Sequence, residues 1–327
     1  MRYRTIGSGP AARRVSTICL GALPFGSTVD EPTSYAILDR FVEAGGTFVD
    51  TSNNYAFWVP GHQGGESETV LGRWRADRGA GDEITIATKL GAQPRTPGGG
   101  LADAEGLSAA AVRTAAARSR ERLGMDRLDL LYTHIEDRSV PLEETLGALA
   151  DEVAASRVGL LGVSNHAVWR VERARALSRD RGWPGYEVLQ YRYSYLQPRP
   201  DVPLPEDGHV HAGPDLLDYV RAEAADGSGP VLVVYTTLLS GAYTNPAKTL
   251  SAPYDHPGTG RRLAALRDVA KEADATPNQV VLSWLLDGDP PVIPLVGVSS
   301  VTQLDEVLAA VDLTLTADQR HRLDEAR

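Results

Sequence analysis

Short apolar runs alternate along the chain with longer stretches in which apolar and polar residues mix at helical spacing. Runs such as 47–49 and 231–235 are built from β-branched, aliphatic and aromatic residues, which is typical of strands buried on both faces. Stretches such as 34–44 and 142–156 place apolar residues three and four positions apart, which predicts helices. Eight such strand–helix units follow one another without a linker-like gap. The pattern predicts an α/β fold, a (β/α)8 TIM barrel, with residues 1–327 as one domain.

Turn-forming residues set the limits of these elements. The expected barrel strands are residues 19–22, 47–49, 84–89, 128–134, 158–165, 187–190, 231–235 and 292–296. The expected helices are residues 34–44, 66–74, 108–123, 142–156, 168–178, 215–225, 262–273, 277–286, 301–309 and 314–327. Residues 1–18 predict an N-terminal β-hairpin, and 56–65, 91–106 and 196–214 predict long loops at the carboxyl-terminal face. A doubly wound fold would carry a G-x-G-x-x-G turn after an early strand, and residues 21–26 do not match it.

The bulk composition excludes several classes of protein. The formal net charge of −10 argues against a nucleic-acid or anionic-membrane partner, whose binding surface would be basic. The one cysteine, Cys19, lies in an apolar run, so neither a disulfide framework nor a multi-cysteine metal site is possible. No apolar stretch is long enough to span a bilayer, and the first residues do not resemble a signal peptide. We therefore expect a cytoplasmic protein, and the sequence does not indicate its oligomeric state.

The first candidate chemistry lies where an apolar run stops at a carboxylate. Residues 47–49 end at Asp50, the turn formers 52–54 follow, and Tyr55 comes directly after them. In a parallel α/β barrel, the carboxyl ends of the strands carry the chemistry. The alternative is a strand-end aspartate that only caps its own turn. Two later strands also end in polar residues, at Lys89 and His134, and all of these ends meet at one mouth.

These side chains suit one chemical task. A phenol is a poor acid at neutral pH, because its unperturbed pKa is about 10. An ammonium at Lys89 would stabilise the phenolate of Tyr55, and the Asp50 carboxylate would hold that ammonium in place. The His134 imidazole can bind the oxygen of a bound carbonyl and share in proton delivery. The set therefore predicts proton donation to a carbonyl oxygen while another group attacks the carbon.

The same residues belong to a series of motifs that resembles the aldo-keto reductase family. The motifs are DTSNNY at 50–55, GESE at 65–68, LG at 71–72, ATK at 87–89, DLLYTH at 129–134, GVSN at 162–165, Gln190, Tyr235, 238–241 and 297–306. They cover nearly the whole chain in the family's order. The resemblance implies that the catalytic tetrad is Asp50, Tyr55, Lys89 and His134.

The resemblance also implies a nicotinamide cofactor across the barrel mouth, NADP (NADPH) more often than NAD, which is not excluded. The implied cofactor-binding residues are Gly21, Ser164, Asn165, Gln190, Tyr235, Leu238, Ser240, Gly241, Gly297, Ser299, Gln303 and Glu306. The sequence departs from the family at 236–237, which is Thr-Thr in place of Ser-Pro, and at Val307 in place of an asparagine. Residues 298–303 contain no basic residue, so the partner of a 2′-phosphate is either Arg261 or Arg262, unless both are solvated helix-start charges.

Loop aromatics and histidines complete the candidates. Phe25, Phe57 and Trp58 lie outside the regular elements at the expected mouth, so we predict that they bind the substrate. His209 and His211 stand near two acidic residues, which suggests a metal, but without a supporting motif we expect a solvated loop and no metal site.

Three functions remain open at this stage. The first is an NAD(P)H-dependent oxidoreductase that reduces an aldehyde or ketone, of a sugar or a secondary metabolite, with Tyr55 as proton donor. The second is a nicotinamide-binding regulatory subunit on the same fold with little catalysis, which the intact tetrad argues against. The third is a lyase that forms a Schiff base on Lys89. That lysine would have to be neutral, whereas Asp50 would keep it charged.

Overall fold

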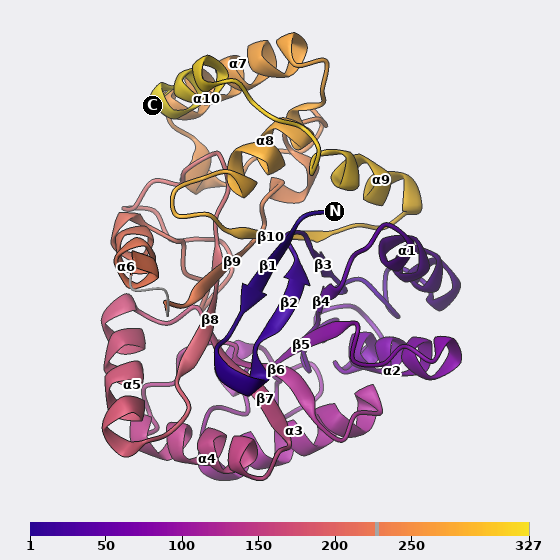
Figure 1. Cartoon of the computed structure of the whole chain (residues 1–327), viewed down its shortest axis with the longest axis vertical. Coiled ribbons are helices and arrows are strands. Elements are labelled where there is room, and N and C mark those ends of the chain that lie inside the picture. Colours follow the sequence, from indigo (N-terminus) through magenta and orange to yellow (C-terminus); the bar gives the residue numbers. More distant parts are fainter. Residues whose placement is uncertain (226–228, 327) are drawn as a thin grey trace.

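Eight parallel strands close into a barrel in the computed structural model, which describes residues 1–225 and 229–326 (Figure 1). The barrel strands are β3 (Cys19–Gly21), β4 (Phe48–Asp50), β5 (Thr85–Leu90), β6 (Leu128–Thr133), β7 (Val158–Ser164), β8 (Tyr186–Arg192), β9 (Val231–Tyr235) and β10 (Ile293–Gly297). Each strand pairs with the next along the chain, and β10 pairs with β3 to close the ring. The predicted TIM barrel is confirmed.

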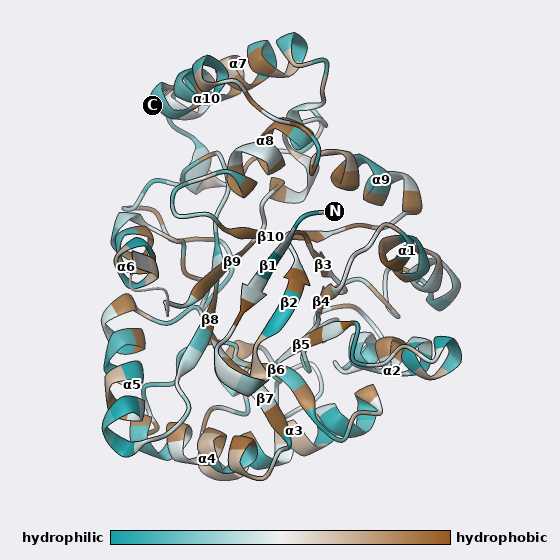
Figure 2. Cartoon of the chain, in the orientation of Figure 1, coloured by the Kyte–Doolittle hydropathy of each residue, from teal (hydrophilic) through white to brown (hydrophobic). Residues whose placement is uncertain are grey.

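Helices surround the ring of strands. They are α1 (Glu31–Glu43), α2 (Glu66–Arg78), α3 (Ala109–Leu123), α4 (Leu142–Ala154), α5 (Val168–Arg181), α6 (Pro214–Ala225), α7 (Pro257–Glu272), α8 (Pro277–Leu286), α9 (Val301–Ala309) and α10 (Ala317–Glu325). Their outer faces are mostly hydrophilic, while the strands are mostly hydrophobic (Figure 2). At the top of Figure 1, α7 and α10 lie outside the ring and pack on each other. None of the helices in the described ranges combines the length and the apolarity that a bilayer crossing needs.

Capping residues explain where several helices begin. Ser108 caps α3 by accepting from the Ala111 amide, and Thr276 begins α8 with a reciprocal capping box. Two helices start earlier than the apolar spacing indicated. In α1, Asp30 accepts from the Thr33 amide, so the helix begins at 31. In α7, the first turn contains proline and two glycines, a composition that reads as irregular, and the helix begins at 257.

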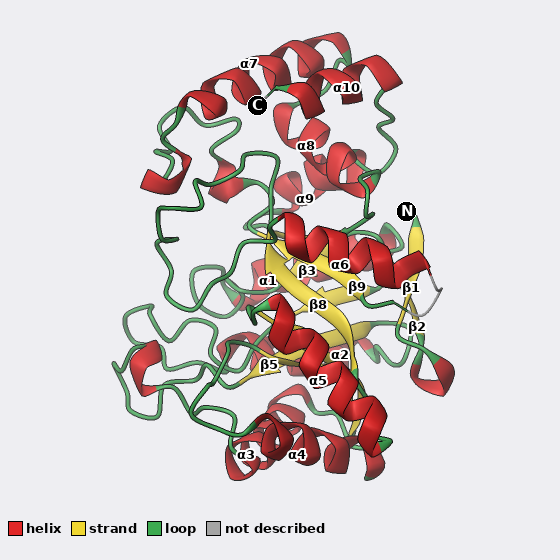
Figure 3. Cartoon of the chain, turned by 90° about the vertical axis from the view of Figure 1, so that its left-hand side faces the viewer, coloured by secondary structure: helices red, strands yellow, loops and turns green. Residues whose placement is uncertain are grey.

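The N-terminal hairpin closes the bottom of the barrel. β1 (Tyr3–Ile6) and β2 (Arg13–Ser16) pair antiparallel, which confirms the predicted hairpin. Ile6 and Val15 are fully buried and join the apolar cluster inside the barrel, which includes Phe48 and Leu160. The hairpin and the long connecting loops lie at opposite ends of the barrel (Figure 3). The end that carries the long loops is therefore the open mouth.

Candidate active site

Three neighbouring strands deliver the catalytic candidates to the mouth. Asp50 is the last residue of β4, Lys89 lies one residue before the end of β5, and His134 directly follows β6. Tyr55 reaches the same place from the turn after β4. Within that turn Ala56 adopts a left-handed conformation (φ 77°), a strain that is often stored at functional sites. Asp50 and Lys89 are fully buried, and Tyr55 and His134 are buried. The structure brings the four predicted residues together.

Lys89 is the centre of the cluster. Its Nζ atom donates to Asp50 Oδ2 (2.5 Å), to the Thr51 carbonyl (2.8 Å) and to Tyr55 Oη (2.7 Å). An ammonium has three N–H donors, and all three are used here. Burial lowers the pKa of Lys89, and the Asp50 carboxylate opposes this shift. Since each proton has an acceptor and one acceptor is a carboxylate, we assign Lys89 as a charged ammonium.

Tyr55 holds its proton firmly. Its Oη atom donates to Asp50 Oδ2 over 3.2 Å, a weak contact, while accepting from Lys89. Burial raises the pKa of Tyr55 well above 10, and the charge of Asp50 adds to the rise. The expected lowering of this pKa by Lys89 does not prevail in the free protein, because burial and the carboxylate both favour the neutral phenol. Tyr55 therefore stays protonated at neutral pH.

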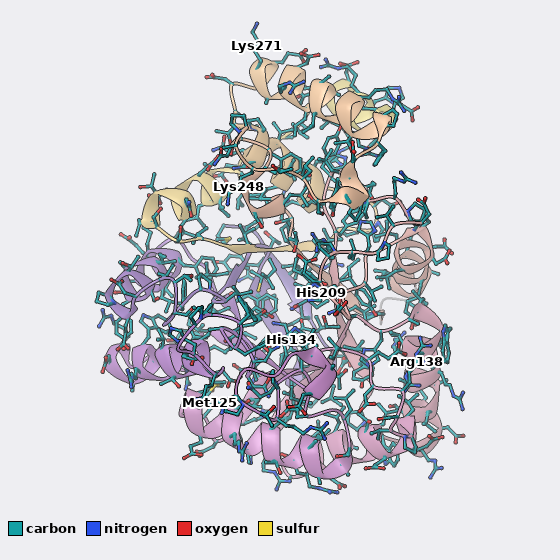
Figure 4. All side chains as sticks on the ribbon, turned by 180° about the vertical axis from the view of Figure 1, so that it is seen from behind. Met125, His134, Arg138, His209, Lys248 and Lys271 are labelled. Atoms are coloured by element: carbon teal, nitrogen blue, oxygen red, sulfur yellow. The ribbon has the colours of Figure 1, made fainter. Side chains whose placement is uncertain are left out.

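His134 is a neutral imidazole at the rim of the cluster. Burial, reinforced by the positive charge of Lys89, lowers the pKa of His134 well below 6.5. Its Nδ1 atom lies 3.1 Å from Ser52 Oγ. The ring meets the Tyr55 ring edge-on, with the centroids 6.2 Å apart. Figure 4, which views the molecule from the mouth side, shows His134 and His209 near the centre of this face.

An amide network adjoins the tetrad. Gln190, on β8, donates from Nε2 to Asp50 Oδ1 (2.7 Å). Asn165 donates from Nδ2 to the His134 carbonyl (3.0 Å) and to Ser164 Oγ (2.9 Å). Its Oδ1 atom accepts from Tyr235 Oη (2.7 Å) and from the Val210 amide (3.0 Å). All the hydrogen-bonding positions of Asn165 are thus filled within the chain.

The segment after β9 forms a strained turn with free amides. Thr236, Leu239 and Ser240 all have left-handed φ angles (56°, 47° and 54°), although none is glycine. Within the described part of the chain, the N–H groups of Leu238 and Ser240 donate to no acceptor. A Cβ atom on Gly241 would meet nothing within 4 Å. Unpaired amides in such a turn form a concavity that suits a phosphate oxygen.

The remaining cofactor candidates lie on and after β10. Gly21 and Gly297 are paired across β3 and β10, and a Cβ on Gly21 would lie 2.7 Å from a Leu295 methyl. Gln303 Oε1 accepts from both the amide (2.8 Å) and the hydroxyl (3.0 Å) of Ser299.

Two charged side chains near that end already have partners. Glu306 accepts from Thr276 Oγ1 (2.7 Å) and from Asn278 Nδ2 (3.3 Å), at the start of α8. Arg262 donates to the Tyr195 carbonyl (2.9 Å) and lies over the Tyr195 ring. Arg262 is therefore occupied by contacts within the chain.

Comparison with known proteins decides the family. Residues 17–327 match the sequence model of the Aldo/keto reductase family. The chain belongs to the aldo/keto reductase family. It is 30% identical to the uncharacterized oxidoreductase YrpG of Bacillus subtilis, over 96% of this chain and 92% of that protein. It is also 30% identical to norsolorinic acid reductase B of Aspergillus parasiticus (99% and 84%) and 26% identical to aryl-alcohol dehydrogenase GME11368 of Pestalotiopsis microspora (99% and 81%).

The three aromatic candidates of this aldo/keto reductase lie in different environments. Trp58 is 51% exposed, and its ring packs edge-on against Phe57 (centroids 5.0 Å apart) and Tyr55 (6.5 Å). Phe57 also lines a cavity of about 140 Å³ with Gln63 and the 93–99 loop. Phe25 is fully buried in the apolar core, because its loop folds back onto the protein. Phe57 and Trp58 are therefore open to a substrate, whereas Phe25 is not.

The 196–214 loop is less solvated than we expected. His209 and His211 are half-buried, and the His209 ring lies edge-on against the Tyr235 ring with the centroids 5.3 Å apart. The backbone of Arg192 bonds the loop at Val210 O (3.2 Å), and its guanidinium pairs with Glu206. The expectation of a solvated loop is wrong, because these contacts fold the loop onto the mouth. In residues 1–225 and 229–326 no three His, Cys, Asp or Glu side chains form a possible metal site.

Some contributors to the site had no sequence signal that we recognised. The residue type of Ser52 indicates only a turn, although its hydroxyl oxygen lies 3.1 Å from His134 Nδ1. Arg192 stands two residues after Gln190, and this period-two spacing on a strand places both on the same face. The Val210 amide carries no side-chain signal at all, since any residue but proline offers a backbone N–H.

Proposed function

We propose that this aldo/keto reductase reduces an aldehyde or ketone to the alcohol with NADPH, with NADH as the second possible donor. The observation that carries the proposal is the triangle of Tyr55 Oη, Lys89 Nζ and Asp50 Oδ2, buried at the barrel mouth with contacts of 2.5 to 3.2 Å. The phenol is the proton donor within this triangle. The hydrogen bond from Tyr55 to Asp50 is long and therefore weak, at 3.2 Å. A substrate carbonyl oxygen at hydrogen-bonding distance can replace Asp50 as its acceptor.

Lys89 and Asp50 govern the charge that develops on Tyr55. When the phenol gives up its proton, the ammonium 2.7 Å away lies beside the new phenolate and stabilises it electrostatically. Asp50 fixes the ammonium on its other side, and the Thr51 carbonyl completes its shell. The same contacts argue against a Schiff base on Lys89, because a fully bonded ammonium has no lone pair to attack a carbonyl carbon.

The cofactor-binding surface fits a dinucleotide at one end as it stands. The free amides of Leu238 and Ser240, with the open space at Gly241, suit the pyrophosphate. At the other end, Ser164, Asn165 and Gln190 would hold the carboxamide and Tyr235 would stack on the nicotinamide ring. When bound, the reduced nicotinamide supplies the hydride to the carbonyl carbon.

The nicotinamide carboxamide can bind to Asn165 only after one hydrogen bond of that residue is broken. The four hydrogen-bonding positions of Asn165 are occupied in the free protein, so a carboxamide has to replace one partner. Of these partners, the Val210 amide is the one supplied by the long 196–214 loop, so we expect it to be released. The residues Gly297, Ser299, Gln303 and Glu306 would then surround the adenosine end, as the family resemblance implies.

The substrate is a small carbonyl compound that reaches beyond the tetrad. Trp58 overhangs the mouth, and Phe57 leads to the cavity beside the 93–99 loop. The relatives named above include a norsolorinic acid reductase and an aryl-alcohol dehydrogenase, and the second of these supports an aryl ketone or aldehyde as the substrate class. A cytoplasmic location stays a prediction from the sequence, as does the single-domain organisation.

Equilibrium titration followed by a carbonyl panel tests the proposal. We expect NADPH to quench the tryptophan fluorescence and to be oxidised when aryl aldehydes and ketones are added. Absence of binding of either nicotinamide at millimolar concentration would overturn the proposal. Binding without turnover on any carbonyl would favour the regulatory subunit instead.

A further inference from the structure

The 91–106 loop returns to the barrel mouth through the side chain of Glu105. An antiparallel bridge between Pro94 and Ala104 joins the two limbs of this loop. The Glu105 amide donates to the Gln93 carbonyl (2.8 Å), so the backbone at the base of the loop is fixed. The Glu105 side chain is half-buried and faces the turn after β4. The loop therefore presents a carboxylate, mounted on paired backbone, to the turn that carries a member of the tetrad.

One oxygen of this carboxylate joins two segments of the chain. Glu105 Oε1 accepts from Asn53 Nδ2 (2.7 Å), in the turn after β4. The same oxygen accepts from the amide of Gly91 (2.7 Å), which follows β5 two residues after Lys89. Burial raises the pKa of Glu105, and these two hydrogen bonds oppose the rise, because both favour the ionised carboxylate. We call this pair of hydrogen bonds the Glu105 clamp, and it ties the turn that carries Tyr55 to the strand that carries Lys89.

The turn that the Glu105 clamp holds is under strain. Ala56 has a left-handed φ angle of 77°, and a residue keeps such a conformation only where its surroundings impose it. Two direct contacts also join this turn to the backbone of the next strand and loop. The Asn53 amide donates to the Lys89 carbonyl over 3.1 Å, and Asn54 Nδ2 donates to the Ala92 carbonyl over 3.3 Å. Both are longer than the hydrogen bonds of the clamp, which is therefore the tighter link.

We propose that Glu105 is a positioning residue that sets the distance between Tyr55 Oη and Lys89 Nζ. The inference rests on the proposed reduction and adds a residue to it, one that acts through the clamp and is not itself catalytic. In the mechanism above, the phenolate forms beside the ammonium, which lies 2.7 Å away in the structure. A displacement of about 1 Å in such a site can cost about 100-fold in rate. Loss of the clamp should therefore slow the chemical step without weakening cofactor binding.

Four variants separate the geometry of the clamp from its charge and from the stability of the loop. Glu105→Leu removes both hydrogen bonds. Glu105→Gln removes the charge but keeps an oxygen that can accept from Asn53 and Gly91. Asn53→Ala breaks the clamp from its other side, and it tests the proposal even if Glu105→Leu does not fold. Asp103→Asn is the matched control, because Asp103 lies in the same loop and bonds the amide (3.0 Å) and hydroxyl (2.6 Å) of Thr96 instead of the turn.

The environment of the Tyr55 oxygen is measured by NMR in the full-length protein without substrate. Tyrosine labelled with ¹³C at Cζ reports the hydrogen bonds of the phenol, and the Tyr55 signal is assigned by its loss in Tyr55→Phe. We expect Glu105→Leu and Asn53→Ala to move this signal, and Glu105→Gln and Asp103→Asn to leave it close to the wild-type position. An unmoved signal in folded Glu105→Leu would overturn the proposal. This result is independent of whether any carbonyl compound is reduced.

Kinetics with NADPH and an aryl aldehyde test the consequence for catalysis. Titration with NADPH counts the folded sites and gives the cofactor affinity, so kcat is expressed per site. In Glu105→Leu we expect kcat to fall about 10- to 100-fold, with the NADPH affinity and the KM for the aldehyde unchanged. Glu105→Gln should stay within about 3-fold of the wild type. An unchanged kcat in Glu105→Leu, an equal loss in Glu105→Gln, or a loss only in the number of sites would refute the positioning role.

Discussion

Replacing Tyr55 by phenylalanine removes one oxygen atom from the centre of the proposed mechanism. The ring keeps its edge-on contacts with Trp58 and His134, whereas the hydroxyl contacts with Lys89 and Asp50 are lost. General acid catalysis is typically worth about 10²- to 10⁴-fold, so kcat should fall by that factor, or about 2.7 to 5.4 kcal/mol in the barrier. Affinity for NADPH should be unchanged, because the expected cofactor contacts are on other residues.

The same substitution has a separate cost in stability. Without the phenol oxygen, one N–H of the Lys89 ammonium is buried with no acceptor, which destabilises a protein by about 1–3 kcal/mol. Urea unfolding should therefore show a lower midpoint for Tyr55→Phe than for the wild type. Activity should be compared without urea, at a temperature at which both proteins are folded. Tyr186→Phe is the matched control. It also removes a buried hydroxyl, one that accepts a 3.4 Å contact from Thr133.

Steady-state oxidation of NADPH at saturating carbonyl gives kcat, and fluorescence titration gives the cofactor affinity. We expect Tyr186→Phe to keep nearly all of its kcat. If folded Tyr55→Phe retains most of the wild-type kcat with intact NADPH binding, Tyr55 is not the proton donor and the mechanism proposed here is refuted.

Three further changes test other parts of the site. Lys89→Met should lower kcat about as much as Tyr55→Phe, and borohydride should trap no carbonyl substrate on the wild-type lysine; trapping would support a Schiff base. Phe57→Ala and Trp58→Ala should each change the kcat/KM of individual aryl carbonyls by about 2- to 12-fold and so reorder them, since an aromatic contact is worth roughly 0.5–1.5 kcal/mol; an unchanged order would make both rings packing residues. The free energy of unfolding should fall as the pH drops below about 6.5, because burial lowers the pKa of four histidines and the unfolded chain binds protons first; urea midpoints that stay constant from pH 7 to pH 5 would contradict this. These histidines are His134, His166, His209 and His211.

The sequence alone was sufficient to predict the barrel and to predict that the four residues of the tetrad lie close together. Parallel strands in a closed ring end at the same face, so a polar residue after each of three apolar runs is brought to one place, whatever its distance along the chain. Asp50, Lys89 and His134 fulfil this rule on adjacent strands. The reasoning needs only the order of the strands, which apolar periodicity supplies.

Details that depend on loop conformation were not predictable in the same way. Phe25 stood in an apolar loop, and nothing in its neighbours indicated that the loop folds inward and buries the ring completely. The contact between Val210 and Asn165 joins a backbone amide to a side chain 45 residues away, and the path of the long loop decides it. Likewise, the pKa of Tyr55 depends on the balance between burial, Asp50 and Lys89. That balance is set by the distances between these groups, which residue type alone does not give.

Closure of the barrel has a consequence for how the chain is made. The first barrel strand pairs with the last, through Gly21 and Gly297, so the ring stays incomplete until nearly the whole chain has been synthesised. At about 5–20 residues per second, a ribosome needs roughly 15 to 60 s to travel between these positions. During that time one edge of β3 is unpaired, and one edge of β9 is unpaired from its own synthesis until β10 follows. The finished enzyme has no open strand edge in its barrel, so aggregation through strand edges is a risk for the nascent chain. Slower translation lengthens the time for which these edges are exposed, and this is the period in which chaperones can act.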